Sequence, residues 1–507
     1  MASLIHRRHL IGGALGAALV GCGGSDANGI THNPDPGAIA PKNIDLALAQ
    51  IDQLTADLMA RMGVPGVAVA VVHGNETIYV RGFGRRDLRG PGLVDADTVF
   101  QLASMSKSLG ATTVAHEVGV GRVRWDQPLH ELLPWFALSD PQASQELTIG
   151  DLYAHRSGLP DHIGDHLEDM GYGQREVLER LRHVPIDGFR QKYAYTNFGL
   201  TAAGIAVAGK AQLDWATLNE QVLYQPLGMR RTSSRFSDFL LRDNRVAGHR
   251  MKNGQWQVNT PRMPDAQAPA ASVTSSVNDL AKWLSMLLGK GAFKGTRIVD
   301  AAALAPALTP QLPNSHYGFG FNVSTTSGGR LRYGHSGAFD LGAATAFNAL
   351  PSANVGIVVL TNGYPVGLPE ILCAQLIDLL EHGAIQRDYL AQIGPYFEGL
   401  NKPRGALVGQ SPPASPVPHE PLSVYAGRYH SDFYGPLQVD LVGGALQLTL
   451  GTTPLRLPLQ HWDGHVFTFR PETENAPPGT ISQARFAANQ VTLELYDDPQ
   501  GLGTFVR

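Results

Sequence analysis

The spacing of apolar residues predicts a helix followed by a β-hairpin at the start of the folded region. Over residues 44–62 the apolar side chains mostly recur every three or four positions, the period of a helix that buries one face. From Val64 to Val72 the chain becomes a run of β-branched and Ala residues, and after a His-Gly-Asn sequence a second such segment extends from Thr77 to Phe83. The Gly/Asn turn between the two segments predicts a hairpin.

A second strand pair and another helix are predicted much later in the chain. The segments Ala344–Ala349 and Val355–Leu360 are apolar and are separated by a turn-forming Leu-Pro-Ser-Ala-Asn sequence. A stretch of helical period then extends from about Leu368 to His382, and the long middle of the chain is mainly helical in pattern. We therefore expect residues 44–400 to form an α+β domain, in which both ends join one antiparallel sheet flanked by helices and an all-helical lobe is inserted between them.

The last part of the chain has a different pattern. Residues 401–421 are rich in Pro among Ala, Ser and Gly, which predicts a linker. Residues 422–507 contain short segments in which apolar and polar residues alternate, and these predict half-buried strands of a small all-β, barrel-like domain. The alternating segments are 437–441, 446–450, 455–459, 466–469 and 491–495.

Length and charge narrow the range of functions. A chain of 507 residues has room for two to four domains and a large core. Its formal net charge of -4 supplies no positive field for gathering phosphates, so we do not expect a nucleic-acid partner. We expect a small-molecule substrate instead, with no cofactor and no metal ion.

The N-terminal residues predict export. Residues 1–22 combine a basic start, an apolar run that is too short to span a bilayer, and small residues that lead to Cys22. Arg7-Arg8 resembles a twin-arginine signal, and Leu19-Val20-Gly21-Cys22 resembles a bacterial lipobox, which would make Cys22 the lipid-bearing residue. We expect a protein of the bacterial cell envelope, anchored on the periplasmic side by this lipid alone, with residues 23–43 as a flexible tether. The alternative is a cleaved, soluble precursor in which Cys22 has no role.

The two cysteines of the chain are consistent with an exported lipoprotein. Two cysteines cannot build a disulfide framework, and a lipid on Cys22 would leave Cys373 without an internal partner. Cys373 lies within the apolar helical stretch, so we expect it to be a small core residue rather than a reactive thiol.

The first chemical motif is Ser104-Met105-Ser106-Lys107, the single S-x-x-K of the chain. If a helix begins near Ser104, positions i and i+3 share a face, and the Lys107 amine can reach the Ser104 hydroxyl. A serine hydroxyl is a weak nucleophile near neutral pH and needs a base beside it, and lysine can act as that base when burial or positive charge lowers its pKa. The alternative is a capping serine with an exposed lysine.

Two further motifs supply complementary groups. Tyr195-Thr196-Asn197 is the single Y-x-N of the chain; the phenol could relay a proton, and the Asn197 amide could bind a substrate amide or hold Lys107. His335-Ser336-Gly337 precedes the apolar strand at residue 344. We expect Gly337 to let the substrate approach the backbone and His335 to add a switchable positive charge or a donor. The N–H groups of Ala338 and Ser104 could together form an oxyanion hole.

Together these motifs resemble the serine penicillin-recognising superfamily, in its branch of class C β-lactamases, D-amino-acid peptidases and carboxylesterases. The family motifs S-x-x-K, Y-x-N and H-x-G match at Ser104 with Lys107, Tyr195 with Asn197, and His335 with Gly337, in family order. The resemblance extends over about residues 44–383, through segments at 125–128, 147–160, 226–229, 275–284 and 317–321. It implies that Ser104 is the acylated nucleophile, that Lys107 and Tyr195 handle protons, and that Asn197 and His335 face the substrate.

One departure bears on the substrate. His335 stands where dedicated β-lactamases usually have a lysine that helps to hold the substrate carboxylate, and the H-x-G form is similar to esterases and peptidases of this branch. We therefore expect a covalent acyl-enzyme acting on carboxylic esters or on peptides and amides, with β-lactams as poor substrates. The C-terminal domain is similar to the lipocalin-like appendages of some of these enzymes.

Other functions remain as alternatives. A true class C-like β-lactamase or D,D-peptidase is the first, and an inactive envelope lipoprotein that binds peptidoglycan or a partner is the second. The G-x-S-x-G elbow and the H-E-x-x-H zinc motif are absent. The segment His155–His166 is dense in His and Asp, but its Gly and Pro residues fit a loop better than a metal site.

Overall fold

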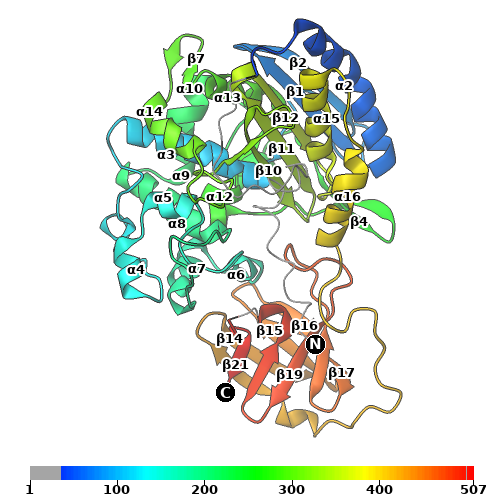
Figure 1. The fold of residues 1–507 in the computed structure, drawn as a ribbon. Coiled ribbons are helices and arrows are strands. Elements are labelled where there is room, and N and C mark those ends of the chain that lie inside the picture. The colour runs from blue at the N-terminus through cyan, green and yellow to red at the C-terminus, as the bar shows by residue number, and fades with distance from the viewer. Residues whose placement is uncertain (1–35, 498–499) are drawn as a thin grey trace.

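The centre of the larger domain is a six-stranded antiparallel sheet, which the computed structural model shows together with the rest of residues 36–497 and 500–507 (Figure 1). The strand order is β2-β1-β12-β11-β10-β9, so strands from both ends of the domain are neighbours. Val67 of β1 pairs with Thr361 of β12, across most of the domain sequence. The strands are β1 (Gly66–His73), β2 (Glu76–Gly84), β9 (Asn322–Thr325), β10 (Leu331–Phe339), β11 (Ala343–Leu350) and β12 (Val355–Thr361).

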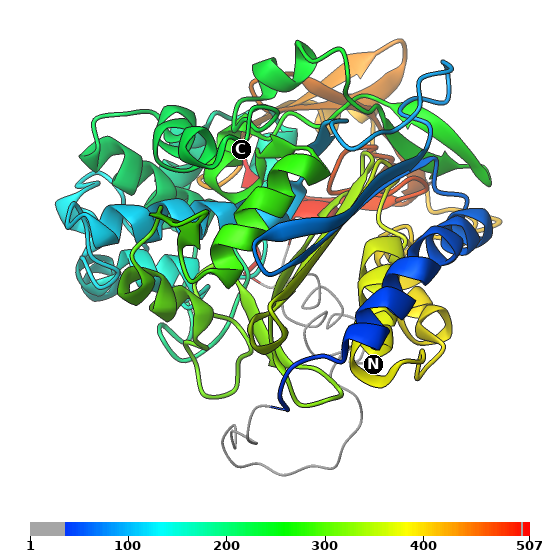
Figure 2. The same ribbon diagram turned by 90° about the horizontal axis from the view of Figure 1, so that it is seen from above.

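Helices from the two ends of the domain cover one face of this sheet (Figure 2). These are α2 (Pro41–Met62), α15 (Leu368–His382) and α16 (Tyr389–Leu400). Ile51 of α2 and Leu372 of α15 are fully buried against strand residues such as Val69. The helix starts at Pro41, so the tether predicted for residues 23–43 is wrong at its last three positions; proline suits the first helical turn because that turn needs no N–H there.

Cys373 lies on α15 and is only 1% exposed. Burial raises the pKa of its thiol to about 12, which opposes thiolate formation. Cys373 is thus a buried residue in the structure, as its sequence environment predicted.

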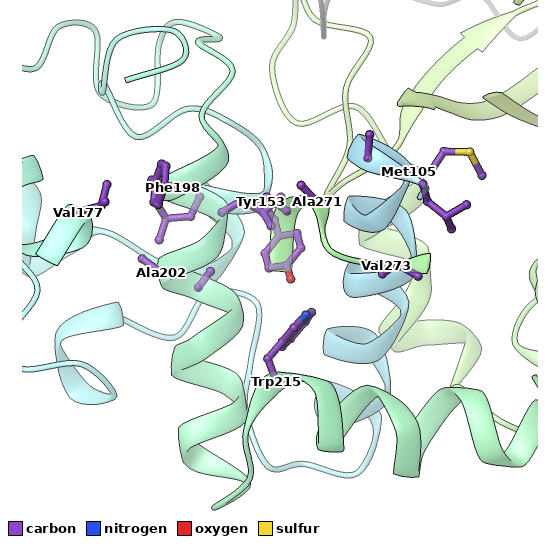
Figure 3. Close-up of a cluster of buried hydrophobic side chains, with 14 of the residues drawn as sticks. Met105, Tyr153, Val177, Phe198, Ala202, Trp215, Ala271 and Val273 are labelled. Atoms are coloured by element: carbon purple, nitrogen blue, oxygen red, sulfur yellow. The ribbon is translucent and has the colours of Figure 1, made fainter. Parts of the chain in front are cut away.

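The opposite face of the sheet packs against α13 (Val277–Leu288) and the helical lobe. The core of the lobe includes Tyr153, Phe198 and Trp215 from three different helices, together with Val273 (Figure 3). The remaining helices and short strands of the larger domain are α3 (Ser106–Gly119), α4 (Pro141–Glu146), α5 (Ile149–Tyr153), α6 (Asp165–Asp169), α7 (Gln174–Arg180), α8 (Asn197–Lys210), α9 (Trp215–Asn219), α10 (Gln225–Leu227), α11 (Phe236–Leu240), α12 (Ala268–Ala271), α14 (Ala301–Leu304), β3 (Phe100–Gln101), β4 (Gly248–Lys252), β5 (Gln255–Asn259), β6 (Thr274–Ser275), β7 (Ala292–Phe293) and β8 (Thr296–Arg297). Of these, the β4–β5 hairpin lies away from the helical lobe, beside α16 (Figure 1).

The C-terminal domain is a nearly closed, nine-stranded antiparallel barrel in the order β16-β15-β14-β13-β21-β20-β19-β18-β17 (Figure 1). Aromatic side chains fill its interior, among them Tyr425, Phe467 and Phe486. The strands are β13 (Gly427–Ser431), β14 (Gly435–Val442), β15 (Ala445–Leu450), β16 (Leu455–Pro458), β17 (Gln460–Asp463), β18 (Val466–Phe469), β19 (Ser482–Ala487), β20 (Gln490–Leu493) and β21 (Thr504–Val506). The predicted α+β domain followed by a small β-barrel is confirmed.

The segment predicted as a linker, residues 401–421, contains no helix or strand. It is nevertheless attached to the barrel, because the Ala406 N–H donates to Glu494 at 2.9 Å and the Val417 N–H donates to Asp463 at 2.6 Å. The segment therefore runs along the barrel surface.

The N-terminal signal, with the twin-arginine-like pair and Cys22, lies outside the described residues. Within the described part of the chain, no helix is both long enough and apolar enough to cross a bilayer.

Candidate active site

Ser104 lies in a single 3-10 turn, Ala103–Met105, that leads directly into α3. The α-helix itself begins at Ser106, two residues after the start considered near Ser104. The spacing argument still applies, because residues i and i+3 are aligned in a 3-10 turn. Ala103, just before the serine, has a φ of 49°, a left-handed conformation that is costly for a residue with a Cβ. The backbone that presents the hydroxyl is thus held in a strained conformation by its surroundings.

Lys107 is completely buried beside this hydroxyl. Its Nζ lies 3.1 Å from Ser104 Oγ, 2.7 Å from Asn197 Oδ1 and 3.1 Å from the Ala270 carbonyl oxygen. Burial lowers the pKa of Lys107 well below its usual value; the Asp165 carboxylate partly opposes this shift and the Arg262 guanidinium adds to it. Burial therefore favours the neutral amine over the ammonium.

Tyr195 approaches the serine from the other side. Its hydroxyl donates to Ser104 Oγ at 2.8 Å, and its ring lies 4.6 Å from Lys107 Nζ. Burial raises the pKa of the phenol and is the largest effect; the Ser104 hydrogen bond lowers this pKa in part, and the Asp165 and Asp161 carboxylates raise it. The phenol is therefore protonated at rest and is a proton donor to the serine oxygen.

Asn197 begins α8 and holds the lysine. Its Oδ1 accepts from Lys107, and its Nδ2 donates to the two carboxylate oxygens of Asp165 at 3.2 and 3.0 Å. Both ends of the amide are occupied, so of the two roles expected for Asn197 the geometry matches the holding of Lys107 rather than contact with substrate.

His335 is 4% exposed, and both of its ring nitrogens have protein partners. Nδ1 lies 2.6 Å from the Ser336 carbonyl oxygen, so it carries the proton, and Nε2 accepts from the Tyr317 hydroxyl at 2.9 Å. Burial lowers the pKa of His335 to about 3, and the nearby Lys107 contributes to this shift. Of the two roles expected for His335, the switchable positive charge does not fit this burial, and the one donor of the neutral ring, Nδ1–H, faces the Ser336 carbonyl oxygen.

Gly337 lies against the turn that carries the nucleophile. A Cβ at this position would lie 2.1 Å from the Leu102 carbonyl oxygen and 3.0 Å from the Ser104 nitrogen. The missing side chain therefore makes room for the Ser104 turn, whereas we expected it to make room for substrate. Ala338 follows on β10, so the two backbone N–H groups predicted as an oxyanion hole come from adjacent segments. Only residues 331–334 of β10 pair with β9, so this part of the strand lies beside the Ser104 turn instead of a further strand.

Sequence reasoning missed several residues that support the site. Asp165 holds Asn197, the Ala270 carbonyl oxygen holds Lys107, and Tyr317 holds His335. His155 accepts from the Thr196 N–H at 3.1 Å, which fixes the turn between Tyr195 and the start of α8. Two of these residues belong to the His- and Asp-rich segment 155–166, so a signal for them was present in the sequence. Across residues 36–497 and 500–507, no three His, Cys, Asp or Glu side chains are grouped to hold a metal ion.

Family comparisons agree with this architecture. Residues 51–381 match the model of the Beta-lactamase family, and residues 411–495 match a domain of unknown function, DUF3471. Among curated proteins, an unguisins hydrolase, ungD of Aspergillus violaceofuscus, is 26% identical over 475 residues, which cover 84% of this chain and 82% of the relative.

Two solved structures share the fold. The octameric penicillin-binding protein homologue from Pyrococcus abyssi has a TM-score of 0.59 and 18% identity, over 90% of this chain and 99% of the homologue. A class C β-lactamase from Rhodobacter sphaeroides has a TM-score of 0.53 and 22% identity, over 66% of this chain and 98% of the lactamase. The first similarity extends over most of the chain, whereas the second corresponds in extent to the larger domain alone.

Proposed function

The chain belongs to the Beta-lactamase family and is a serine hydrolase of that family; from this premise we propose that it hydrolyses carboxylic esters or peptides and amides through an acyl-enzyme on Ser104. The observation that carries the proposal is the set of contacts around one hydroxyl. Ser104 Oγ lies 3.1 Å from a buried amine and 2.8 Å from a protonated phenol. A base and an acid thus touch the same nucleophile, as acyl transfer requires.

The partners of Lys107 support a role as general base. A neutral amine has two N–H groups and one lone pair, whereas an ammonium has three N–H groups and no lone pair. The Asn197 side-chain oxygen and the Ala270 carbonyl oxygen can only accept, so they take the two N–H groups. In the neutral form, which burial favours, the lone pair then faces Ser104 Oγ and can accept its proton as the oxygen attacks a carbonyl carbon.

The partner of Tyr195 supports a role as general acid. The phenol is held at the serine oxygen with its proton in place, so it can donate that proton to the leaving group as the tetrahedral intermediate collapses. The proton taken by Lys107 then returns to the phenolate oxygen, since the amine and the phenol both lie against Ser104 Oγ. Water attacks the resulting ester in the same way and releases the acid. The negative charge on the substrate oxygen would be met by the N–H groups of Ser104 and Ala338.

The state of His335 argues for esters or amides over β-lactams. A β-lactam antibiotic carries a carboxylate next to the reacting ring, and a cation near the third motif would hold it. His335 is neutral and its ring nitrogens are already bonded, so it supplies no such cation. Similarity to a class C β-lactamase favours the second candidate, a true β-lactamase or D,D-peptidase, and substrate comparison separates the two.

The test uses the intact protein and a panel of substrates. We expect a fluorophosphonate probe to add one adduct to the wild type by intact mass, and Ser104→Ala to abolish both the adduct and the hydrolysis of short-chain aryl esters. Lys107→Ala should lower kcat/KM by about 10²- to 10⁴-fold, the usual range for a lost general base. Ser415→Ala is the matched control and should behave as wild type, because Ser415 is exposed and lies in the segment 401–421 that runs along the barrel.

Two results would contradict the proposal. A folded wild type that no probe labels would favour a binding protein of the envelope. A chromogenic cephalosporin cleaved faster than aryl esters and D-aminoacyl amides would favour the β-lactamase.

The place of action is part of the same proposal. We propose that the chain is exported to the bacterial cell envelope and held on the periplasmic side by a lipid on Cys22, because residues 1–22 carry both signals. Radiolabelled palmitate should be incorporated by the full-length chain in a bacterial host and not by Cys22→Ser. Equal incorporation by both would refute the anchor.

A further inference from the structure

We infer that one loop of the C-terminal barrel, residues 472–476 between β18 and β19, is a positioning element of the hydrolase site. The inference rests on the proposed function, since it concerns the geometry of Lys107. The loop contacts the helical lobe at α6 and the sheet domain at the turn between β10 and β11. Through Asp165, α6 holds the Asn197 amide that contacts Lys107, and the strand before this turn lies against the Ser104 turn, so the barrel contacts elements on both sides of the site. In Figure 1 the helix α6 lies at the part of the larger domain that faces the barrel.

On the side of the helical lobe, residues of the loop donate hydrogen bonds to two acidic residues of α6, Asp165 and Asp169. The Asn475 side chain donates to Asp169 Oδ2 at 2.9 Å and to the backbone oxygen of Asp165 at 3.1 Å, and the Asn475 backbone N–H also reaches Asp169. The Thr473 hydroxyl donates to the same Asp169 oxygen at 2.7 Å. Asp169 is half-buried, and these donors stabilise its carboxylate against the burial that raises its pKa.

The contacts with α6 are linked to the Lys107 amine through two hydrogen bonds. Asp165, the first residue of α6, accepts from Asn197 Nδ2, and the opposite end of that amide accepts from Lys107. Loop, helix, amide and amine therefore form one continuous chain from Asn475 to Lys107. A helix of five residues has little stability of its own, so its position depends on what packs against it.

On the sheet side Glu474 holds the turn after β10. Its carboxylate accepts from the backbone N–H groups of Asp340 at 2.9 Å and Leu341 at 3.0 Å. It also pairs with Arg262 at 2.9 Å, and Arg262 in turn pairs with Glu168 of α6 and lies over the ring of Phe339, the last residue of β10. Glu474 thus fixes the end of the strand whose Gly337 and Ala338 lie beside the nucleophile.

A further turn of the barrel holds the segment that follows α6. The Thr452 N–H donates to the Met170 carbonyl oxygen at 2.9 Å, and the Tyr172 hydroxyl donates to the Tyr434 carbonyl oxygen at 2.8 Å. The barrel therefore contacts α6 at both ends. Loss of the loop contacts alone should leave the two domains attached, and point variants can then test the positioning role without separating them.

The experiment compares full-length loop variants by steady-state hydrolysis of an aryl ester. We expect Asn475→Ala and Thr473→Val to lower kcat by about tenfold or more with KM changed less than twofold, because a displacement of about 1 Å at a catalytic group costs up to 10²-fold. Thr473→Ser retains the hydroxyl donor and should restore wild-type kcat. Glu472→Gln is the matched control, since Glu472 lies on the same loop but pairs only with exposed Lys252 in the described contacts.

Hydrogen exchange provides a second readout that does not depend on activity. In Asn475→Ala, faster exchange should be confined to α6 and the start of α8. The inference is overturned if Asn475→Ala and Thr473→Val retain kcat within twofold of Glu472→Gln. A wild type without Ser104-dependent turnover would instead refute the proposed function. In that case the exchange result decides the inference: faster exchange confined to α6 and α8 supports it, and unchanged exchange overturns it.

Discussion

Gly337→Ala is the sharpest single test of the site geometry. The new methyl group would lie 2.1 Å from the Leu102 carbonyl oxygen, 2.5 Å from Thr345 Oγ1 and 3.0 Å from the Ser104 nitrogen. The carbonyl cannot easily turn away, because it already accepts from Thr345 Oγ1 at 2.8 Å and from the Met105 N–H at 3.3 Å. Relief must therefore come from a shift of the turn that carries the nucleophile.

The size of the shift follows from the contact distance. Separating the methyl carbon from the carbonyl oxygen from 2.1 Å to at least 3.0 Å requires a movement of about 0.9 Å. A misplacement of about 1 Å at a reacting group costs up to about 10²-fold in rate. Overpacking in a close-packed region also destabilises by roughly 1–3 kcal/mol. We therefore expect kcat/KM to fall by about 10²-fold and the melting temperature to fall by several degrees.

The measurement is kcat/KM for an aryl ester together with a thermal melt of each protein. Gly209→Ala is the matched control, because nothing lies within 4 Å of the methyl it would add, near the end of α8. Alanine favours helix by up to about 1 kcal/mol over glycine, so this control should be as stable as wild type or more so, with full activity. A Gly337→Ala protein with wild-type kcat/KM would show that β10 does not press against the nucleophile turn.

Two further predictions concern pH. Asp165→Asn removes a negative charge that raises the pKa of Lys107, so the acid limb of the kcat/KM profile should move to lower pH; an unmoved limb would contradict Lys107 as the base. Burial raises the pKa of Glu370 to about 7, above the roughly 4.3 of an unfolded chain. Its stabilising effect is therefore complete below about pH 4 and is lost as the pH rises through about 7. The melting temperature of wild type should fall between about pH 5 and pH 8 by more than that of Glu370→Gln, and equal slopes would refute this assignment.

The parts of the fold that were predictable from sequence are those with a long, regular pattern. The helix at 368–382 has a clear period over four turns, and the strands around 64–72 and 355–360 are continuous apolar runs because they lie at the centre of a sheet covered on both faces. The small helices of the lobe are mostly three to seven residues long, too short for a period to show. Strand β13 was missed because a Gly, an Arg and a His interrupt its alternation, and only two of its residues are buried.

The residues of the site that could be predicted from sequence are those within its three motifs. S-x-x-K and Y-x-N named residues that the fold brings within hydrogen-bonding distance of Ser104 or Lys107, and H-x-G named the strand whose glycine lies against the Ser104 turn. Their protonation states were not predictable, because burial decides them: the same His335 would be a switch on a surface and is neutral here. The contacts of Asp165 and Asn475 could not be predicted either, since they depend on how two separate domains pack against each other.

The pairing of β1 with β12 determines when the central sheet can be completed during synthesis of the chain. Val67 and Thr361 are neighbours in the sheet but 294 positions apart in the chain, so at roughly 5–20 residues per second the ribosome needs about 15–60 s to deliver the second strand after the first. Throughout that interval β1 lacks its β12 partner, so one of its two edges is unpaired. We expect the nascent chain to need a chaperone that holds it until β12 has been synthesised.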